Sequence, residues 1–199
     1  MSRILRSALA IGTGTAALAA GLLLAAPQHT PQSTTEASPR IGTAAAGTPT
    51  ALQIKARHSG QCLTIPKASL RNSVGLVQSP CTATAPNQRI QLVPTGAGTF
   101  ELRFEHSGKC LDVQGWGTTS GTSAQQFWCL SGQPNQQWRL ILTDIENDFY
   151  ELVPAHLPTT GKLCLDVTTS SQDDGAAVRL WTCNGTAAQQ WRIAPLAIA

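Results

Sequence analysis

Two aspartates stand at matched places in a segment that the sequence repeats. Asp112 lies in GKCLDV and Asp166 in GKLCLDV, whereas a third copy, GQCLTI, keeps the cysteine and leucine but has Thr64 in place of the aspartate. An ionised carboxylate offers two acceptor oxygens, and hydrogen bonds to a charged acceptor are the stronger class. A lone aspartate in a β turn is more often a partner of the local backbone. Because the aspartate is missing from one copy, we infer that the cysteine serves the fold and the aspartate a ligand.

The residues that would support catalysis are missing. The sequence contains no GxSxG, HExxH or GxxxxGK[ST] motif. Asp173 and Asp174 are adjacent, and neighbouring side chains seldom face each other across a substrate as a glycosidase pair does. We therefore expect a protein that is not an enzyme, with no metal or cofactor, and with no room for a catalytic domain beside the repeats.

The cysteines define the repeat. In each copy a second cysteine follows the first by 19 residues, and a matched tail follows, NQRIQLV, NQQWRLI or AQQWRIA. Six cysteines allow 15 pairings, but only one gives equivalent units equivalent bonds: Cys62–Cys81, Cys110–Cys129 and Cys164–Cys183. Each bridge would close a loop worth about 3 kcal/mol of stability. The absence of a close CxxC pair disfavours a zinc site.

The elements between the cysteines read as short β-strands. Runs such as ALQIKA, FELRF and YELVP are separated by Gly, Pro, Asn and Ser, and no long 3.6-residue periodicity follows the N-terminal segment. This predicts an all-β body of three equivalent lobes. Trp138 and Trp191 recur at the end of their copies, where the first copy has Ile90, and we expect all three in the core. His58 and His106 occupy equivalent HSG turns, which indicates a structural role.

The combination of Cys-Leu-Asp-Val, a second cysteine preceded by an aromatic, and Asn-Gln-x-Trp resembles the ricin-B-type lectin repeat. The resemblance runs from about Ala51 to Pro195. It implies a β-trefoil of three lobes, α, β and γ, over residues 51–196, and a secreted carbohydrate-binding protein. Sugar recognition needs acceptors for adjacent hydroxyls and an aromatic face against the C–H side of the pyranose.

The resemblance places the first site in the β lobe, and most of the expected positions are filled there. The residues are Asp112, Gln125, Phe127, Asn135 and Gln136. Phe127 would stack on the sugar. Trp128 is the alternative platform if the alignment slips by one, because a strand turns only one of two neighbouring side chains toward the ligand.

The other two lobes match less well. In the γ lobe Asp166, Trp181, Asn184 and Gln189 fit, but Arg179 replaces the glutamine and Ala188 the asparagine, so this site is expected to be weaker. In the α lobe Thr64 and Ser79 replace the aspartate and the aromatic, while Asn87 and Gln88 remain. We expect the α lobe not to bind sugar.

Two roles stay open at this stage. Gln136 and Gln189 either orient the aspartate or touch the sugar. Trp116, in the turn VQGWGTT, either gives the β-lobe site a wall or folds onto its own lobe as a surface aromatic, and the second interpretation is preferred.

The N-terminal region predicts export. Residues 1–26 combine two arginines with an apolar segment and small residues, the pattern of a secretory signal peptide, with cleavage as late as residue 46 an option. The alternative is a retained membrane anchor, for which the apolar stretch is barely long enough. Residues 27–50, rich in Pro, Thr and Ala, are expected to be a linker. Export would place the cysteines in an oxidising compartment.

Charge narrows the class of partner. With Arg3, Arg6, Arg40 and Glu36 set aside, the chain from residue 47 onward carries 11 basic and 10 acidic residues. A nearly neutral domain without a basic cluster is a poor candidate for binding nucleic acid. The same holds for an anionic membrane once the signal peptide is removed. We expect a secreted monomer that binds mono- or polysaccharide. Galactose-, xylan- and mannose-type ligands all remain open. The second hypothesis is a trefoil that binds protein, such as a protease inhibitor, through the insert HLPTTGKL at 156–163.

Overall fold

A computed structural model of the protein describes residues 51–158, 160 and 162–196. These residues belong to one compact unit, Ala44–Ala199. The predicted signal peptide and linker, residues 1–50, lie outside the described residues. Within the described part, no helix is long and apolar enough to span a membrane.

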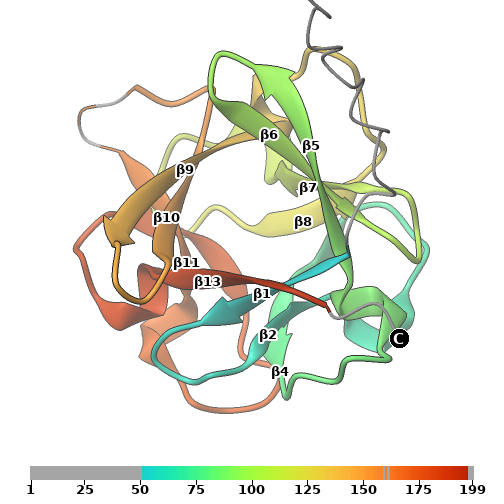
Figure 1. Ribbon diagram of the computed structural model, residues 1–199. Coiled ribbons are helices and arrows are strands. Elements are labelled where there is room, and N and C mark those ends of the chain that lie inside the picture. Colours follow the sequence, from blue (N-terminus) through green and yellow to red (C-terminus); the bar gives the residue numbers. More distant parts are fainter. Residues whose placement is uncertain (1–50, 159, 161, 197–199) are drawn as a thin grey trace, which may run out of the picture. The chain divides into compact units, whose positions relative to one another are not determined.

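Six strands form a closed antiparallel barrel (Figure 1). Each pairs with two others, in the order β1, β5, β6, β9, β10, β13 and back to β1. Closing the sheet leaves no unpaired edge, which short strands of this kind need. The bounds are Leu52–Ala56 for β1, Ile90–Gly96 for β5, Thr99–Phe104 for β6, Gln137–Asp144 for β9, Phe149–Pro154 for β10 and Trp191–Pro195 for β13.

Three hairpins attach to this barrel, one in each repeat. They are β2 (Cys62–Thr64) with β4 (Val77–Ser79), β7 (Cys110–Val113) with β8 (Ala124–Phe127), and β11 (Leu163–Val167) with β12 (Val178–Thr182). A short β3 (Val74–Gly75) also pairs with β8. Single 3-10 turns connect the strands: η1 Pro66–Ala68, η2 Pro86–Gln88, η3 Gln114–Trp116, η4 Pro134–Gln136, η5 Thr168–Ser170 and η6 Ala187–Gln189. The predicted all-β trefoil is confirmed.

The predicted disulfides are also confirmed. The three bonds join Cys62 to Cys81, Cys110 to Cys129 and Cys164 to Cys183. Each ties the first strand of a hairpin to the loop that follows the second strand, so each lobe is closed in the same way.

One core serves all three lobes. Ile90, Trp138 and Trp191 are fully buried, as the sequence predicted. The Trp138 indole N–H donates to the Leu111 carbonyl at 3.1 Å, and that of Trp191 donates to the Leu165 carbonyl at 3.0 Å. Each bond joins a barrel strand to the residue just before Asp112 or Asp166. The core therefore fixes the position of both carboxylates relative to the barrel.

Equivalent histidines connect neighbouring lobes. The Nε2 atoms of His58, His106 and His156 lie 2.8, 3.1 and 3.2 Å from main-chain carbonyls at the ends of η5, η1 and η3. Burial lowers the pKa of His106, so its ring is neutral at neutral pH and Nε2 carries the proton it donates. The structural role predicted for His58 and His106 is confirmed, and His156 is the third member of the set.

Candidate functional site

Strand register assembles the β-lobe site. Across β7 and β8, Asp112 stands opposite Gln125 and Cys110 opposite Phe127. Residues two apart on a strand share a face, so Gln125 and Phe127 lie on the same side as the carboxylate. The turn η4 then adds Asn135. The structure therefore brings together all five residues predicted for this lobe.

Asp112 is held from three directions by side-chain amides. Gln125 Nε2 donates to Oδ1 at 2.8 Å, and Asn135 Nδ2 and Gln136 Nε2 donate to Oδ2 at 2.8 and 3.0 Å. Asp112 is only 4% exposed, yet it lines the floor of a cavity of about 220 Å³. Burial raises the pKa of the Asp112 carboxyl, and the bonds from Gln125, Gln136 and Asn135 partly offset the rise. An anion is thus fixed at the base of a pocket at a cost in solvation.

Of the two candidate aromatics, Phe127 is the one at the cavity. Its side chain lines the cavity. Trp128 is 60% exposed outside it, with Lys109 Nζ 3.7 Å from the centroid of its ring. This placement favours Phe127 over Trp128 as the stacking face, because strand alternation turns its neighbour away from the pocket.

Trp116 forms a second wall of the same cavity. The preferred interpretation, a surface aromatic folded onto its own lobe, is therefore wrong. Gly115 and Trp116 have φ values of 58° and 57°, and the matched turns at Lys67–Ala68 and Thr169–Ser170 are left-handed as well, so this backbone belongs to the repeat. His156 supports the indole edge-on, with ring centroids 5.8 Å apart. The sequence could not reveal this, because the handedness of the turn sets where the indole goes.

Gln136 makes hydrogen bonds to several groups of its own lobe, which favours the orienting role over contact with a ligand. It is 1% exposed, and besides Asp112 it bonds Trp128 O and Leu130 N, both at 2.8 Å. Asn135 lines the pocket, and its Nδ2 donates to Asp112, whereas its Oδ1 is buried without a partner among the described residues. A buried acceptor that lacks a donor is costly. The remaining lining, Leu130 and Gln133, has no signal in the repeat.

The γ lobe builds a related pocket with different chemistry. Asp166 stands opposite Arg179, and Cys164 opposite Trp181. Gln189 Nε2 donates to Asp166 Oδ2 at 3.2 Å, and Arg179 Nε lies 3.4 Å from Oδ1. Burial raises the pKa of Asp166, which the bonds from Gln189 and Arg179 partly offset. The guanidinium carbon of Arg179 also lies 3.9 Å from the centroid of the Trp181 ring.

The predicted γ-lobe residues divide into lining and support. Asp166, Trp181 and Asn184 line a cavity of about 250 Å³. Gln189 is fully buried and also holds Thr182 O and Asn184 N, so it orients the carboxylate as Gln136 does. Sequence reasoning missed the other lining residues, Thr169, Ser170 and Thr186, because their types carry no signal without the turn geometry.

The α lobe has no carboxylate at this position. Thr64 donates its hydroxyl to Cys62 O at 2.8 Å and accepts from Gln88 Nε2 at 3.1 Å. Asn87 Nδ2 donates to Ile65 O at 2.8 Å. The polar groups of the motif are therefore used within the fold, and Gln88 keeps the loop contact to Thr82 N at 2.8 Å that Gln136 makes in the β lobe.

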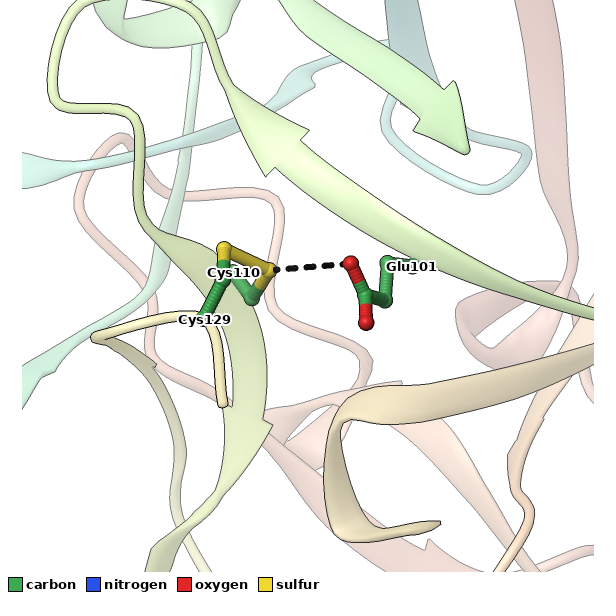
Figure 2. A group of neighbouring side chains, drawn as sticks. All are labelled: Glu101, Cys110 and Cys129. Carbon is green, nitrogen blue, oxygen red and sulfur yellow. Dashed lines mark hydrogen bonds between the residues drawn. A yellow bond between two sulfur atoms is a disulfide. The ribbon is translucent and has the colours of Figure 1, made fainter. Parts of the chain in front are cut away.

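A buried carboxylate beside a disulfide recurs in two lobes. Figure 2 shows Glu101 next to Cys110 and Cys129, with Oε2 3.8 Å from Cys110 Sγ. The bridged sulfur has no proton to donate and is no thiolate, so the group cannot ligate a metal as thiolate sites do. Glu101 instead pairs with Arg103 at 2.7 Å, and Glu151 in the γ lobe with Lys162 at 2.8 Å. These carboxylates are structural.

A protein-family model matches most of the chain. The family model described as "Ricin-type beta-trefoil lectin domain-like" matches residues 40–127 and 134–197. A search of curated protein sequences found no match. Among solved structures, the designed threefold-symmetric protein ThreeFoil is 36% identical, with a TM-score of 0.66 over 73% of this chain and 99% of that one.

Two natural proteins extend this comparison. An exo-β-1,3-galactanase from Clostridium thermocellum is 26% identical, with a TM-score of 0.67 over 75% of this chain but only 31% of its own. A ricin B-like lectin from Macrolepiota procera, solved with lactose, has the same fold at 18% identity, a TM-score of 0.62 and coverage of 76% and 99%.

Proposed function

This chain belongs to the ricin-type β-trefoil lectin-like family, and we propose that it is a secreted protein that binds sugars chiefly through the Asp112 pocket. Carbohydrate binding is the role that the family supports. The assignment to this pocket rests on its chemistry, a fixed anionic acceptor between two aromatic walls, Phe127 and Trp116.

The pocket suits one face and one edge of a pyranose. Asp112 Oδ1 accepts one amide proton, from Gln125, and keeps a lone pair for a ligand hydroxyl, whereas Oδ2 already accepts from both Asn135 and Gln136. Phe127 provides an apolar face for the C–H side of the ring. Because the site is shallow, a simple sugar should bind at about 0.1–1 mM.

The observation that carries this proposal is the buried carboxyl of Asp112, which side-chain amides hold but no cation in its pocket pairs. No cation lies among the residues that line its pocket. The α lobe shows that Thr64 can fill the position and still satisfy the matched glutamine. A carboxylate that the fold can replace and that raises the cost of burial is best explained by a ligand.

The first experiment is a glycan array together with immobilised polysaccharides. The protein should be retained by at least one glycan, and Asp112→Ala should lower that retention tenfold or more, since a charge-assisted bond is worth about 1.5–3 kcal/mol. Asp174→Ala is the matched control, because Asp174 is an exposed carboxylate outside both pockets.

Equal retention of the wild type and Asp112→Ala would remove this pocket from the account. Retention by no glycan at all would favour the second hypothesis, a trefoil that binds protein through residues 156–163. Residues 159 and 161 of that segment lie outside the described residues.

A further inference from the structure

We propose that the γ-lobe pocket takes a sugar that carries an anionic group, such as a uronic acid, while the β-lobe pocket takes a neutral one. This rests on the proposed carbohydrate-binding function and assigns the two pockets different ligands. It starts from one substitution within the repeat, Arg179 at the position that Gln125 fills in the β lobe.

Arg179 is held through its Nε atom and the plane of its guanidinium, which leaves its two terminal nitrogens free to donate to a ligand. Its Nε side faces Asp166 at 3.4 Å, and its plane stacks on Trp181 with 3.9 Å between the guanidinium carbon and the ring centroid. A guanidinium has five N–H donors. The two terminal nitrogens of Arg179 make no hydrogen bond to the described residues, and the side chain lines the cavity.

Charge distinguishes the two cavities. The β-lobe lining holds Asp112 and no cation, so a carboxylate on the sugar would be repelled there. The γ-lobe lining pairs Asp166 with Arg179 and adds hydroxyls from Thr169 and Ser170. A planar guanidinium fork matches the two oxygens of a carboxylate, and it also accepts a sulfate or phosphate ester.

The stacked guanidinium also changes what the aromatic can do. Trp181 is 36% exposed, but the Arg179 side chain occupies part of the space above its ring. A neutral pyranose would have to displace that cation and would offer nothing to replace the cation–π contact. An anionic sugar can instead bind the outer edge of the stacked guanidinium and leave it in place.

The test uses the Asp112→Ala protein, in which the β-lobe pocket is silenced. Three probes are titrated while the Trp181 indole N–H resonance is followed by NMR: methyl β-galactopyranoside, its C6 carboxylate and its 6-sulfate, with the gluco series in parallel. We expect one anionic glycoside to bind about tenfold to a hundredfold more tightly than the neutral one. The uronate and sulfate arms identify which group is recognised.

Adding Arg179→Gln should abolish the preference for the anionic sugar and strengthen binding of the neutral one, because it restores the residue found in the β lobe. Arg179→Lys keeps the charge but not the planar fork, and should retain only a small part of the preference. The free energy of unfolding, measured for each variant, ensures that only folded protein is compared.

Equal affinity for neutral and anionic probes would overturn the inference, and so would no response at Trp181 while the wild-type protein still binds a glycan through Asp112. Either result leaves the proposed function intact. Failure of the wild-type protein to bind any glycan would instead overturn both.

Discussion

The folded state favours the protonated form of Asp112, whereas the proposed sugar binding favours the ionised form. The pKa of its carboxyl is raised by burial above the ordinary value of 3.8. A raised pKa means that protonation favours the folded state, so the contribution of Asp112 to stability is fully present below pH 3.8 and is lost as pH rises through the folded pKa. In the binding mode that we propose, the ionised form contacts the sugar, because it is the stronger acceptor.

We therefore predict opposite pH trends for stability and affinity. As pH falls from 7 through the raised pKa of Asp112, glycan affinity should drop while the contribution of Asp112 to the free energy of unfolding rises. The difference between wild type and Asp112→Asn, in denaturant unfolding and in glycan titration across pH 3–7, isolates this group. Parallel trends in the two measurements would argue against Asp112 as the acceptor.

Substitution of the matched glutamines Gln88 and Gln136 can distinguish a structural role from a role in binding. Gln136 and Gln88 hold the loop after the second cysteine in the same way, but only Gln136 also bonds an aspartate. Gln136→Ala and Gln88→Ala should each cost about 1–3 kcal/mol of unfolding free energy, because each removes a buried amide that bonds three or more groups. Only Gln136→Ala should weaken binding of the retained glycan. A comparable loss of affinity in Gln88→Ala would mean that the effect is global.

The sequence predicts a site residue when strand position alone determines where its side chain points. Asp112 and Phe127 could be predicted because the repeat fixes their distance from the cysteines and strand alternation fixes their face. Trp116 could not, because its direction comes from two left-handed residues in η3. The effect of Arg179 on Trp181 was also hidden, since residue type alone does not show a stacked pair.

At the scale of elements, the hairpins reproduce one register three times. The first cysteine faces Ser79, Phe127 or Trp181, and the aspartate position faces Val77, Gln125 or Arg179. The bridge therefore sits directly beside the platform residue in each lobe. The fold could be predicted this far from the sequence because spacing and residue type agree in every copy.

The disulfides should contribute equally to stability but unequally to binding. Replacing Cys62 and Cys81 by alanine, or Cys110 and Cys129, should each cost about 3 kcal/mol of unfolding free energy, since both bridges close loops of the same length. Only the second change should also weaken glycan binding, because it loosens the strand end that carries Phe127. Loss of binding in a folded protein without the first bridge would contradict this assignment.

At the scale of the whole molecule, three lobes share one core but have diverged at their rims. The closed barrel and the buried Trp138 and Trp191 hold all three hairpins in fixed positions, so each lobe can change its pocket without disturbing the others. A polymer that offers both a neutral and an anionic sugar would engage two pockets on one rigid body and gain from avidity.

The most direct test of the central claim is to map the bound glycan on the folded wild-type protein. The glycan best retained on the array is titrated into labelled protein, and the side-chain resonances of Gln125, Phe127 and Asn135 are followed by NMR. We expect these resonances to shift together at a single affinity, while the side-chain resonance of Asn87 in the α lobe stays unchanged. Saturable binding that leaves all three still, and shifts residues elsewhere, would contradict it.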